Sequence, residues 1–318
     1  MALLEVSDLT MHYTTKKGEV KAVDDVSFSL EQGEALGLVG ESGCGKTSVA
    51  LTLLKLLPEN ARFLKGHVYF KGRDLVTLPE EGMRKVRWKG ISMIFQAAMN
   101  SLNPVYRVGD QIVEAMQTHM EISTEAAKKR VAELYDLVGI DPKMMERYPH
   151  EYSGGMKQRA VIAMALSCDP EVIIADEPTT ALDVIVQEKI LREMRQIQQE
   201  LNMGMIYISH DIAVIAEVAD KMGVMYAGKI VEFGNTLDLF QRPVHPYTKA
   251  LMSAFPSIEG EKRKLESLPG EPPDLINPPQ GCRFHPRCPY ATAVCTKEIP
   301  RFEAHRDGHY AACWNPLK

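Results

Sequence analysis

The octapeptide Gly40-Glu41-Ser42-Gly43-Cys44-Gly45-Lys46-Thr47 has the GxxxxGK(S/T) spacing with which a backbone wraps the phosphates of a nucleotide. The apolar run 35–39 before it predicts a buried strand, and residues 48–57 after it predict a helix. At such a strand-to-helix turn the glycines permit unusual backbone angles, and the free N–H groups of the helix start face the phosphates. The sequence therefore predicts an α/β protein that binds and hydrolyses a nucleoside triphosphate.

The side chains of this loop have separate expected roles. Lys46 can reach the β and γ oxygens of the nucleotide, and Thr47 offers a hydroxyl to Mg2+. The Cys44 thiol lies at a helix start, where a thiolate is electrostatically favoured. We expect the nucleotide to contact Gly40, Ser42, Gly43, Cys44, Gly45, Lys46, Thr47 and Ser48.

A second apolar run, 172–175, ends in two acids, Asp176 and Glu177. A core strand that delivers carboxylates to the carboxyl edge of a parallel sheet has this pattern. Asp176 would hold Mg2+, and Glu177 would be the general base that polarises the attacking water. The pattern is weak by itself, but together with the phosphate loop it predicts ATPase chemistry.

Five further motifs in this order give the chain a specific resemblance. Ser153-Gly154-Gly155 resembles the signature motif of the ATP-binding subunits of ABC transporters, and Ala181-Leu182-Asp183 resembles their D-loop. Gln96 falls where that family has its Q-loop glutamine, and His210 where it has its switch histidine. Tyr13 falls where the family has an aromatic residue that stacks on adenine.

The resemblance implies an ATP site shared between two subunits. Ser153 and the two glycines after it open an apolar helix, which presents N–H groups and a positive dipole end to an anion. In the family, two ATPase subunits stack head to tail, and each ATP lies between one phosphate loop and the signature helix of the partner. Gln96 is then a further Mg2+ contact, Asp183 lies near the shared nucleotide, and Lys46, Glu177 and His210 carry the chemistry.

Composition limits the function. The chain has 318 residues, of which 25% are charged and 45% apolar, and a net charge of −5, which argues against a nucleic-acid partner. It contains no apolar run of about eighteen residues, as a spanning helix needs. Glu5 and Asp8 stand where a secretory leader would be basic. We therefore expect a protein that does not itself cross the membrane and lies at the cytoplasmic side of the cell membrane.

The expected fold class is an α/β P-loop NTPase core of the ABC ATPase type, with a helical subdomain and a small, loop-rich C-terminal extension. Residues 1–235 would form the ATPase domain, with the helical subdomain at about 97–167, and residues 236–318 the extension. Expected strands cover 3–13, 35–39, 91–95, 172–176, 205–209 and 222–226. Expected helices of the subdomain cover 109–120 and 124–138. The resemblance places a contact with membrane subunits at Asn100–Tyr106.

The extension contains four of the six cysteines, Cys282, Cys288, Cys295 and Cys313, at the spacing C-x5-C-x6-C-x17-C. A loop-rich segment needs extra stabilisation, and disulfides are disfavoured in a reducing cytosol, so the thiolates are interpreted as metal ligands. The absence of a short C-x2–4-C pair favours a 4Fe-4S cluster over zinc, which stays an alternative together with unligated thiols. His285, His305 and His309 are possible substitute ligands.

His245-Pro246-Tyr247, the proline-rich tail and the cysteines also resemble the C-terminal extension of ATPases of dipeptide, oligopeptide and nickel importers, some of which carry such a cluster. The resemblance implies ATP-driven import of dipeptides or oligopeptides. It also implies a second homologous ATPase as a homodimer or heterodimer partner, two membrane permeases and, through them, an extracytoplasmic substrate-binding protein. The alternatives are an importer ATPase for nickel or another small solute and, from another class, a soluble ABC ATPase that acts on ribosomes or DNA.

Overall fold

The computed structural model describes residues 2–180, 182–253 and 268–317. The chain divides into two compact units. The first comprises Met1–Leu30, Ala35–Val76 and Ile208–Lys318, and the second comprises Glu31–Glu34 and Thr77–Tyr207. No helix among the described residues is long and apolar enough to span a bilayer.

The first unit contains a four-stranded antiparallel sheet with the strand order β2-β1-β4-β5. Its strands are β1 (Leu4–Thr15), β2 (Gly18–Leu30), β4 (Ala61–Phe70) and β5 (Arg73–Asp74). Leu4, Leu9 and Met11 of β1 are fully buried, so one face of this sheet belongs to the core. The register of β1 against β2 shifts at several points, because bulges interrupt the strict alternation of the strand.

The first unit also contributes five neighbouring strands of a second sheet, in the order β11-β12-β10-β9-β3. These are β3 (Ala35–Val39), β9 (Lys221–Tyr226), β10 (Lys229–Asn235), β11 (Glu303–Arg306) and β12 (His309–Ala311). β3 and β9 run parallel, and the other pairs are antiparallel. The helices of this unit are α1 (Lys46–Leu53), α7 (Ile212–Val218), α8 (Thr236–Gln241) and α9 (Pro246–Ser253).

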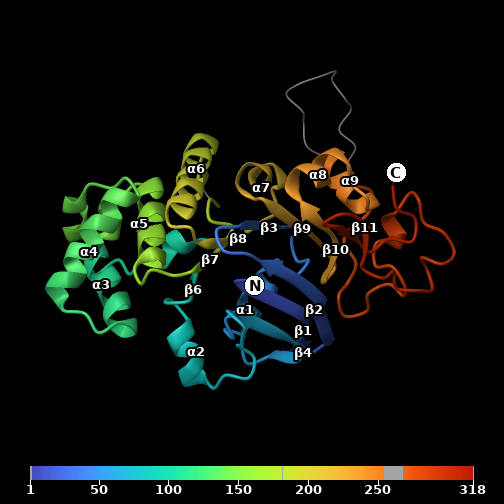
Figure 1. Cartoon of the computed structure of the whole chain (residues 1–318), viewed down its shortest axis with the longest axis horizontal. Helices are drawn as coiled ribbons and strands as arrows, with labels where there is room; N and C mark the ends of the chain where they lie inside the picture. The colour runs from blue at the N-terminus through green and yellow to red at the C-terminus, as the bar shows by residue number, and fades with distance from the viewer. Residues whose placement is uncertain (1, 181, 254–267, 318) are drawn as a thin grey trace. The chain divides into compact units, whose positions relative to one another are not determined.

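The second unit contains strands in the order β8-β7-β6, of which β6 and β7 run parallel. They are β6 (Ile91–Ile94), β7 (Val172–Asp176) and β8 (Gly204–Ser209), and the division between the two units falls within β8. The helices are α2 (Glu80–Val86), α3 (Val108–His119), α4 (Thr124–Leu137), α5 (Gly154–Leu166) and α6 (Val184–Glu200). Between β6 and β7 all secondary structure is helical, and α3, α4 and α5 pack against one another (Figure 1).

The expected strands and helices of the nucleotide core are confirmed within a few residues. All five residues of β3 are buried, as predicted for the strand before the phosphate loop. The predicted helices 109–120 and 124–138 correspond to α3 and α4. The side chain of Ser123 accepts a hydrogen bond from the N–H of Ala126 and so fixes the start of α4.

The C-terminal segment has more regular structure than the sequence predicts. β11 and β12 form a hairpin, and β12 pairs with β10 through Glu232 with Ala311 and Phe233 with Tyr310. Strands of three or four residues carry too little alternation to be predicted from the sequence. Here the hairpin is placed by the backbone hydrogen bonds that β12 forms with the edge of β10 that does not pair with β9. The boundary between a nucleotide domain and an extension near residue 235 stays a prediction.

Candidate nucleotide site

The phosphate loop joins β3 to α1, as the sequence predicts. Gly40 and Gly45 have φ angles of 152° and 108°, which other residues rarely adopt. A Cβ atom at Gly40 would lie 2.1 Å from the carbonyl oxygen of Met225, and one at Gly45 would lie 2.0 Å from that of Ala22. Only glycine therefore lets the loop pack this closely on the neighbouring backbone.

Lys46 lies at the first position of α1 with only 6% of its surface exposed. Its Nζ donates hydrogen bonds to the carbonyl oxygens of Gly40 at 2.7 Å and Glu41 at 3.1 Å. The lysine thus spans the loop from its C-terminal to its N-terminal end. A bound phosphate would compete with these carbonyls for the ammonium group, and the stronger charge-assisted partner is the phosphate.

Three hydroxyl side chains lie in this part of the site. Thr47 is exposed at the start of α1, where the predicted Mg2+ contact requires it. The Tyr13 hydroxyl lies 3.1 Å from Oγ of Ser48. Tyr13 of β1 therefore lies beside the helix that follows the phosphate loop, and its contact with the adenine stays a prediction.

The expectation of a reactive Cys44 thiolate is wrong in this structure. The residue is 5% exposed, and burial raises the pKa of its thiol more than the nearby charge of Lys46 lowers it. The helix start alone predicts a lowered pKa, but the burial of the thiol, which depends on the folded chain, raises it. Cys44 therefore packs as a small neutral side chain below the loop.

The second unit positions the predicted carboxylates. Asp176 ends β7 and is 1% exposed, whereas Glu177 follows it with a left-handed φ of 46°. The Gln96 side-chain amide donates a hydrogen bond to Oε2 of Glu177 at 2.8 Å, and the Thr180 hydroxyl donates to the same oxygen at 3.1 Å. The structure therefore brings together the predicted Q-loop glutamine and the predicted base.

The predicted signature motif forms a capped helix start. The Ser153 hydroxyl accepts a hydrogen bond from the N–H of Met156 at 3.3 Å, and Ser153 and Gly154 are exposed. Asp183 caps α6 in the same manner by accepting from the N–H of Val186 at 3.0 Å. A Cβ atom at Gly155 would lie 3.1 Å from Cγ1 of Val186, so the two predicted motifs are neighbours. Ala181 of the predicted D-loop lies outside the described residues, and His210 is exposed after β8.

The four C-terminal cysteines are free thiols. No group of three or more His, Cys, Asp or Glu side chains in the described parts of the chain is placed to hold a metal ion, so the structure supports neither the predicted 4Fe-4S cluster nor zinc, its alternative. Burial raises the pKa of the Cys282 and Cys288 thiols, and it raises that of Cys313 to about 12. The sulfurs of other cysteines in this segment raise these pKa values further.

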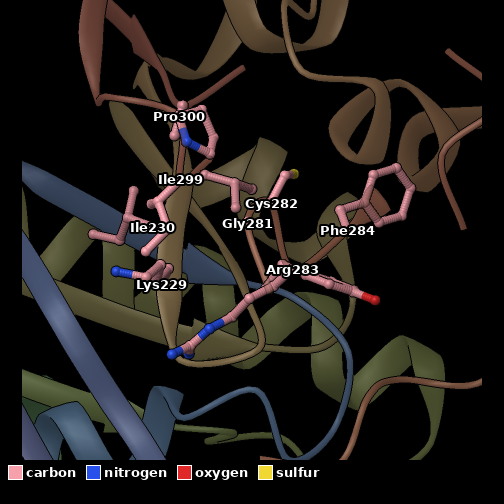
Figure 2. Close-up of a pocket in the computed structure, with 11 residues that line it drawn as sticks. Lys229, Ile230, Gly281, Cys282, Arg283, Phe284, Ile299 and Pro300 are labelled. Atoms are coloured by element: carbon pink, nitrogen blue, oxygen red, sulfur yellow. The ribbon is translucent and has the colours of Figure 1, made fainter. Parts of the chain in front are cut away.

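A small pocket is lined in part by Cys282. It is lined mainly by apolar groups, with Ile230, Ile299 and Pro300 on one side and Phe284 on the other (Figure 2). Its volume of about 30 Å³ is far too small for a nucleotide. The pocket therefore does not compete with the phosphate loop as the nucleotide site.

One contact of the phosphate loop has no signal in the sequence. Arg287, in the short helix His285–Arg287, donates to both carboxylate oxygens of Glu41. The residues are 246 positions apart, and neither lies in a pattern that would pair them. The C-terminal segment thus reaches the nucleotide loop directly.

The fold and the glycine loop define a nucleotide-binding protein of the P-loop class. Residues 23–180 match the family described as "ABC transporter", and residues 231–295 match "Oligopeptide/dipeptide transporter, C-terminal region". The chain belongs to the ABC transporter family, as an ATP-binding protein with the C-terminal region of the oligopeptide/dipeptide branch. The resemblance inferred from the motifs is confirmed.

Named relatives cover the whole chain. The oligopeptide transport ATP-binding protein OppD of Escherichia coli is 46% identical over 100% of this chain and 94% of its own length. The dipeptide transport ATP-binding protein DppD of Bacillus subtilis is 46% identical over 98% of this chain and 94% of its own. Among solved structures, the dimeric bacterial ABC transporter cassette MJ0796 has a TM-score of 0.65 and 25% identity, over 73% of this chain and 98% of that one. The match to cbiO1 of Clostridium perfringens has a TM-score of 0.66 and 25% identity, over 76% of this chain and 91% of that one.

Proposed function

We propose that this chain is the ATP-binding and ATP-hydrolysing subunit that energises import of dipeptides or oligopeptides across the cytoplasmic membrane. The observation that supports ATP binding and hydrolysis is the glycine loop, whose Gly40 and Glu41 carbonyl oxygens accept hydrogen bonds from Nζ of Lys46. The peptide part rests on the relatives, whose names are those of oligopeptide and dipeptide transport proteins, and on the match of residues 231–295.

Each predicted site residue has a proposed role in hydrolysis. Lys46 and the loop N–H groups neutralise the β and γ phosphates, and Tyr13 stacks on the adenine. Thr47, Asp176 and Gln96 would hold Mg2+, which would neutralise charge at the phosphates. His210 contacts the γ-phosphate side of the site. The nucleotide contacts of the loop are Gly40, Ser42, Gly43, Cys44, Gly45, Lys46, Thr47 and Ser48.

Glu177 is the proposed general base. Its carboxylate orients a water for in-line attack on the γ-phosphorus and accepts a proton from it as the bond to the β–γ bridging oxygen breaks. The hydrogen bonds from Gln96 and Thr180 hold the carboxylate in one orientation, which limits the positions that the water can occupy. Binding of the nucleotide and Mg2+ near Gln96 would therefore directly change the orientation of the Glu177 carboxylate.

A second copy of the cassette completes the site in this proposal. The capped helix start at Ser153, with Gly154, Gly155 and nearby Asp183, offers N–H donors that the chain's own nucleotide does not need. A head-to-tail dimer with twofold or pseudo-twofold symmetry uses them on the partner's ATP. ATP binding would close this dimer and hydrolysis would reopen it.

The proposed partners are a second homologous ATPase, two membrane permeases and, through the permeases, an extracytoplasmic substrate-binding protein. The exposed apolar side chains of Val105 (70%) and Tyr106 (59%) support a contact with the permeases at Asn100–Tyr106. The chain would be peripheral, at the cytoplasmic side of the membrane. Nickel or another small solute is the alternative cargo, because the permeases and the binding protein select it.

The test is co-purification followed by transport. The tagged chain, expressed with its neighbouring transport subunits, should come out of detergent-solubilised membranes with two permeases and a second ATPase. In right-side-out vesicles, ATP inside, on the ATPase side, should drive uptake of external peptide, ATP outside should not, and Glu177→Gln should stop the uptake. A chain that hydrolyses ATP but copurifies with ribosomes or DNA would contradict the proposal, and uptake of nickel without peptide would select the alternative.

We also propose that Cys282, Cys288, Cys295 and Cys313 hold a 4Fe-4S cluster. The support for it is the sequence, which places four cysteines at the spacing C-x5-C-x6-C-x17-C without the short C-x2–4-C pair that zinc prefers. Protein purified without oxygen should contain about four irons and four labile sulfides per chain. Single Cys→Ser variants should lose them while ATP still binds. One zinc, or no metal, would overturn this proposal.

A further inference from the structure

The contact between Arg287 and Glu41 is a two-pronged ion pair. Nη1 of Arg287 lies 2.7 Å from Oε2 of Glu41, and Nη2 lies 3.0 Å from Oε1. The side chains are 5% and 26% exposed, so little water screens the pair. A planar guanidinium that meets both oxygens of a carboxylate fixes orientation as well as charge.

Glu41 is also held through its backbone. Its N–H donates to the hydroxyl of Tyr247 at 3.1 Å, and its carbonyl oxygen accepts from Nζ of Lys46 at 3.1 Å. Side chain, amide and carbonyl of one loop residue thus each have a partner. The position of the Glu41 peptide next to Gly40 is therefore determined from outside the loop.

Arg287 is itself rigidly placed. Its Nε donates to the carbonyl oxygen of Pro269 at 2.8 Å, and Nη1 also lies 3.4 Å from the hydroxyl of Tyr226. The guanidinium carbon lies 5.8 Å from the centre of the Tyr226 ring. The pair with Glu41 and these contacts raise the pKa of Arg287, so it stays charged. The arginine can transmit the position of the C-terminal segment to the loop.

The negative charge of Glu41 links the ion pair with Arg287 to the binding of a nucleotide. A carboxylate within a loop that receives phosphates opposes their binding unless a cation neutralises it. Lys46 is committed to the phosphates, so Arg287 is the cation that bonds to the Glu41 carboxylate at close range. Removal of Arg287 would leave a poorly hydrated negative charge beside the phosphate site.

We propose that Arg287 is a positioning residue that acts on the phosphates of ATP through charge: it neutralises the Glu41 carboxylate beside the phosphate loop, so that the C-terminal segment sets the ATP affinity. This inference rests on the proposed ATP binding. Arg287 acts through Glu41 and touches no reacting atom, so it should affect ATP affinity much more than turnover at saturation.

The test measures the Kd for ATP with a fluorescent ATP analogue and the kcat and KM of hydrolysis on the full chain. Arg287→Gln should raise Kd and KM about tenfold, equivalent to about 1.4 kcal/mol, with kcat within about twofold. Arg287→Lys, which keeps the charge but not the fork, should lie between this variant and the wild type. Glu41→Gln should bind ATP at least as tightly as the wild type, because it removes the opposing charge.

The decisive comparison is the double variant Arg287→Gln/Glu41→Gln. It should recover most of the affinity lost in Arg287→Gln, because no uncompensated carboxylate is left. The matched control is Arg283→Gln, which breaks the ion pair with Asp24 in the same segment but touches no residue of the loop. It should lower Tm and leave Kd within about twofold.

Three results would overturn the inference: wild-type Kd in Arg287→Gln, no recovery in the double variant, or an equal loss of affinity in Arg283→Gln. If Arg287→Gln does not fold, Arg287→Lys and Glu41→Gln carry the same test, and weaker binding by Glu41→Gln would contradict it. A wild-type chain that binds no ATP would instead refute the proposed function itself. The two failures are therefore distinguishable.

Discussion

The side-chain amide of Gln96 donates a hydrogen bond of 2.8 Å to the carboxylate of Glu177. The glutamine follows β6 and the glutamate follows β7, and these strands are parallel neighbours, so their carboxyl ends meet at one edge. Glu177 has a left-handed φ of 46°, an uncommon conformation for this residue type. The backbone conformation and the hydrogen bonds from Gln96 and Thr180 together hold this side chain in one orientation, which the proposed role of Glu177 as the base requires.

Glu177→Gln should abolish most ATP turnover and preserve ATP binding. The amide keeps the size of the side chain but cannot accept a proton from water, so hydrolysis should fall by roughly 10²- to 10⁴-fold. A nucleotide-locked dimer should accumulate, visible by size-exclusion chromatography with MgATP. Near-normal hydrolysis would remove Glu177 from the role of base.

Gln96→Ala should have a smaller effect on the same step. Loss of one hydrogen bond to a charged group is worth about 1.5–3 kcal/mol, so kcat should fall by roughly 10- to 100-fold. Thr180→Val, which removes the other hydrogen bond to Oε2, is the matched comparison. If Gln96→Ala weakens ATP binding but leaves kcat unchanged, the hydrogen bond does not orient the base.

Lys46→Ala should fail earlier, at nucleotide binding. The substitution deletes the cation for the phosphates and also leaves the carbonyls of Gly40 and Glu41 without their Nζ donor. The Kd for ATP should rise by roughly 100-fold, equivalent to about 3 kcal/mol. Circular dichroism should report an unchanged fold, since the glycine angles do not depend on the lysine. ATP binding at wild-type affinity would contradict the role of Lys46.

The sequence predicted the parts of the site that are local in the chain. β3, the phosphate loop and α1 are contiguous, and the required glycine angles follow from a spacing within one short stretch. The sequence did not predict β2 and β4, because bulges interrupt the alternation of strands that pair over long distances. The sequence did not predict the contact between Arg287 and Glu41 either. The two residues are 246 positions apart, and only tertiary packing brings them together.

The thiol of Cys44 shows the limit of a local electrostatic argument. A helix start favours the thiolate, but the buried position costs the charged form more. N-ethylmaleimide should therefore inactivate the ATPase slowly at pH 7 and faster towards pH 9, and MgATP should slow the reaction further by covering the loop. Cys44→Ser should remove the inactivation. Rapid modification at pH 7 that this variant abolishes would show that the thiol is accessible and ionised.

The last prediction concerns pH and stability. His245 is fully buried, its ring Nδ1 accepts a hydrogen bond from the backbone N–H of Tyr247 at 3.0 Å, and its backbone N–H donates to Oε2 of Glu232 at 2.8 Å. Burial lowers its pKa to about 4, against the partial opposing effect of Glu232, so the folded protein holds the neutral imidazole. In the unfolded chain the pKa is about 6.5.

Between pH 4 and pH 6.5, the His245 imidazole is therefore protonated in the unfolded chain but neutral in the folded protein. The stabilisation is fully present above about pH 6.5 and is lost as the pH falls towards 4, up to about 3 kcal/mol. His245→Asn keeps an acceptor for the Tyr247 N–H but does not titrate. Its Tm should fall less than that of the wild type between pH 7 and pH 5, whereas exposed His150→Asn should follow the wild type. Parallel Tm profiles for wild type and His245→Asn would show that His245 is not the group that titrates.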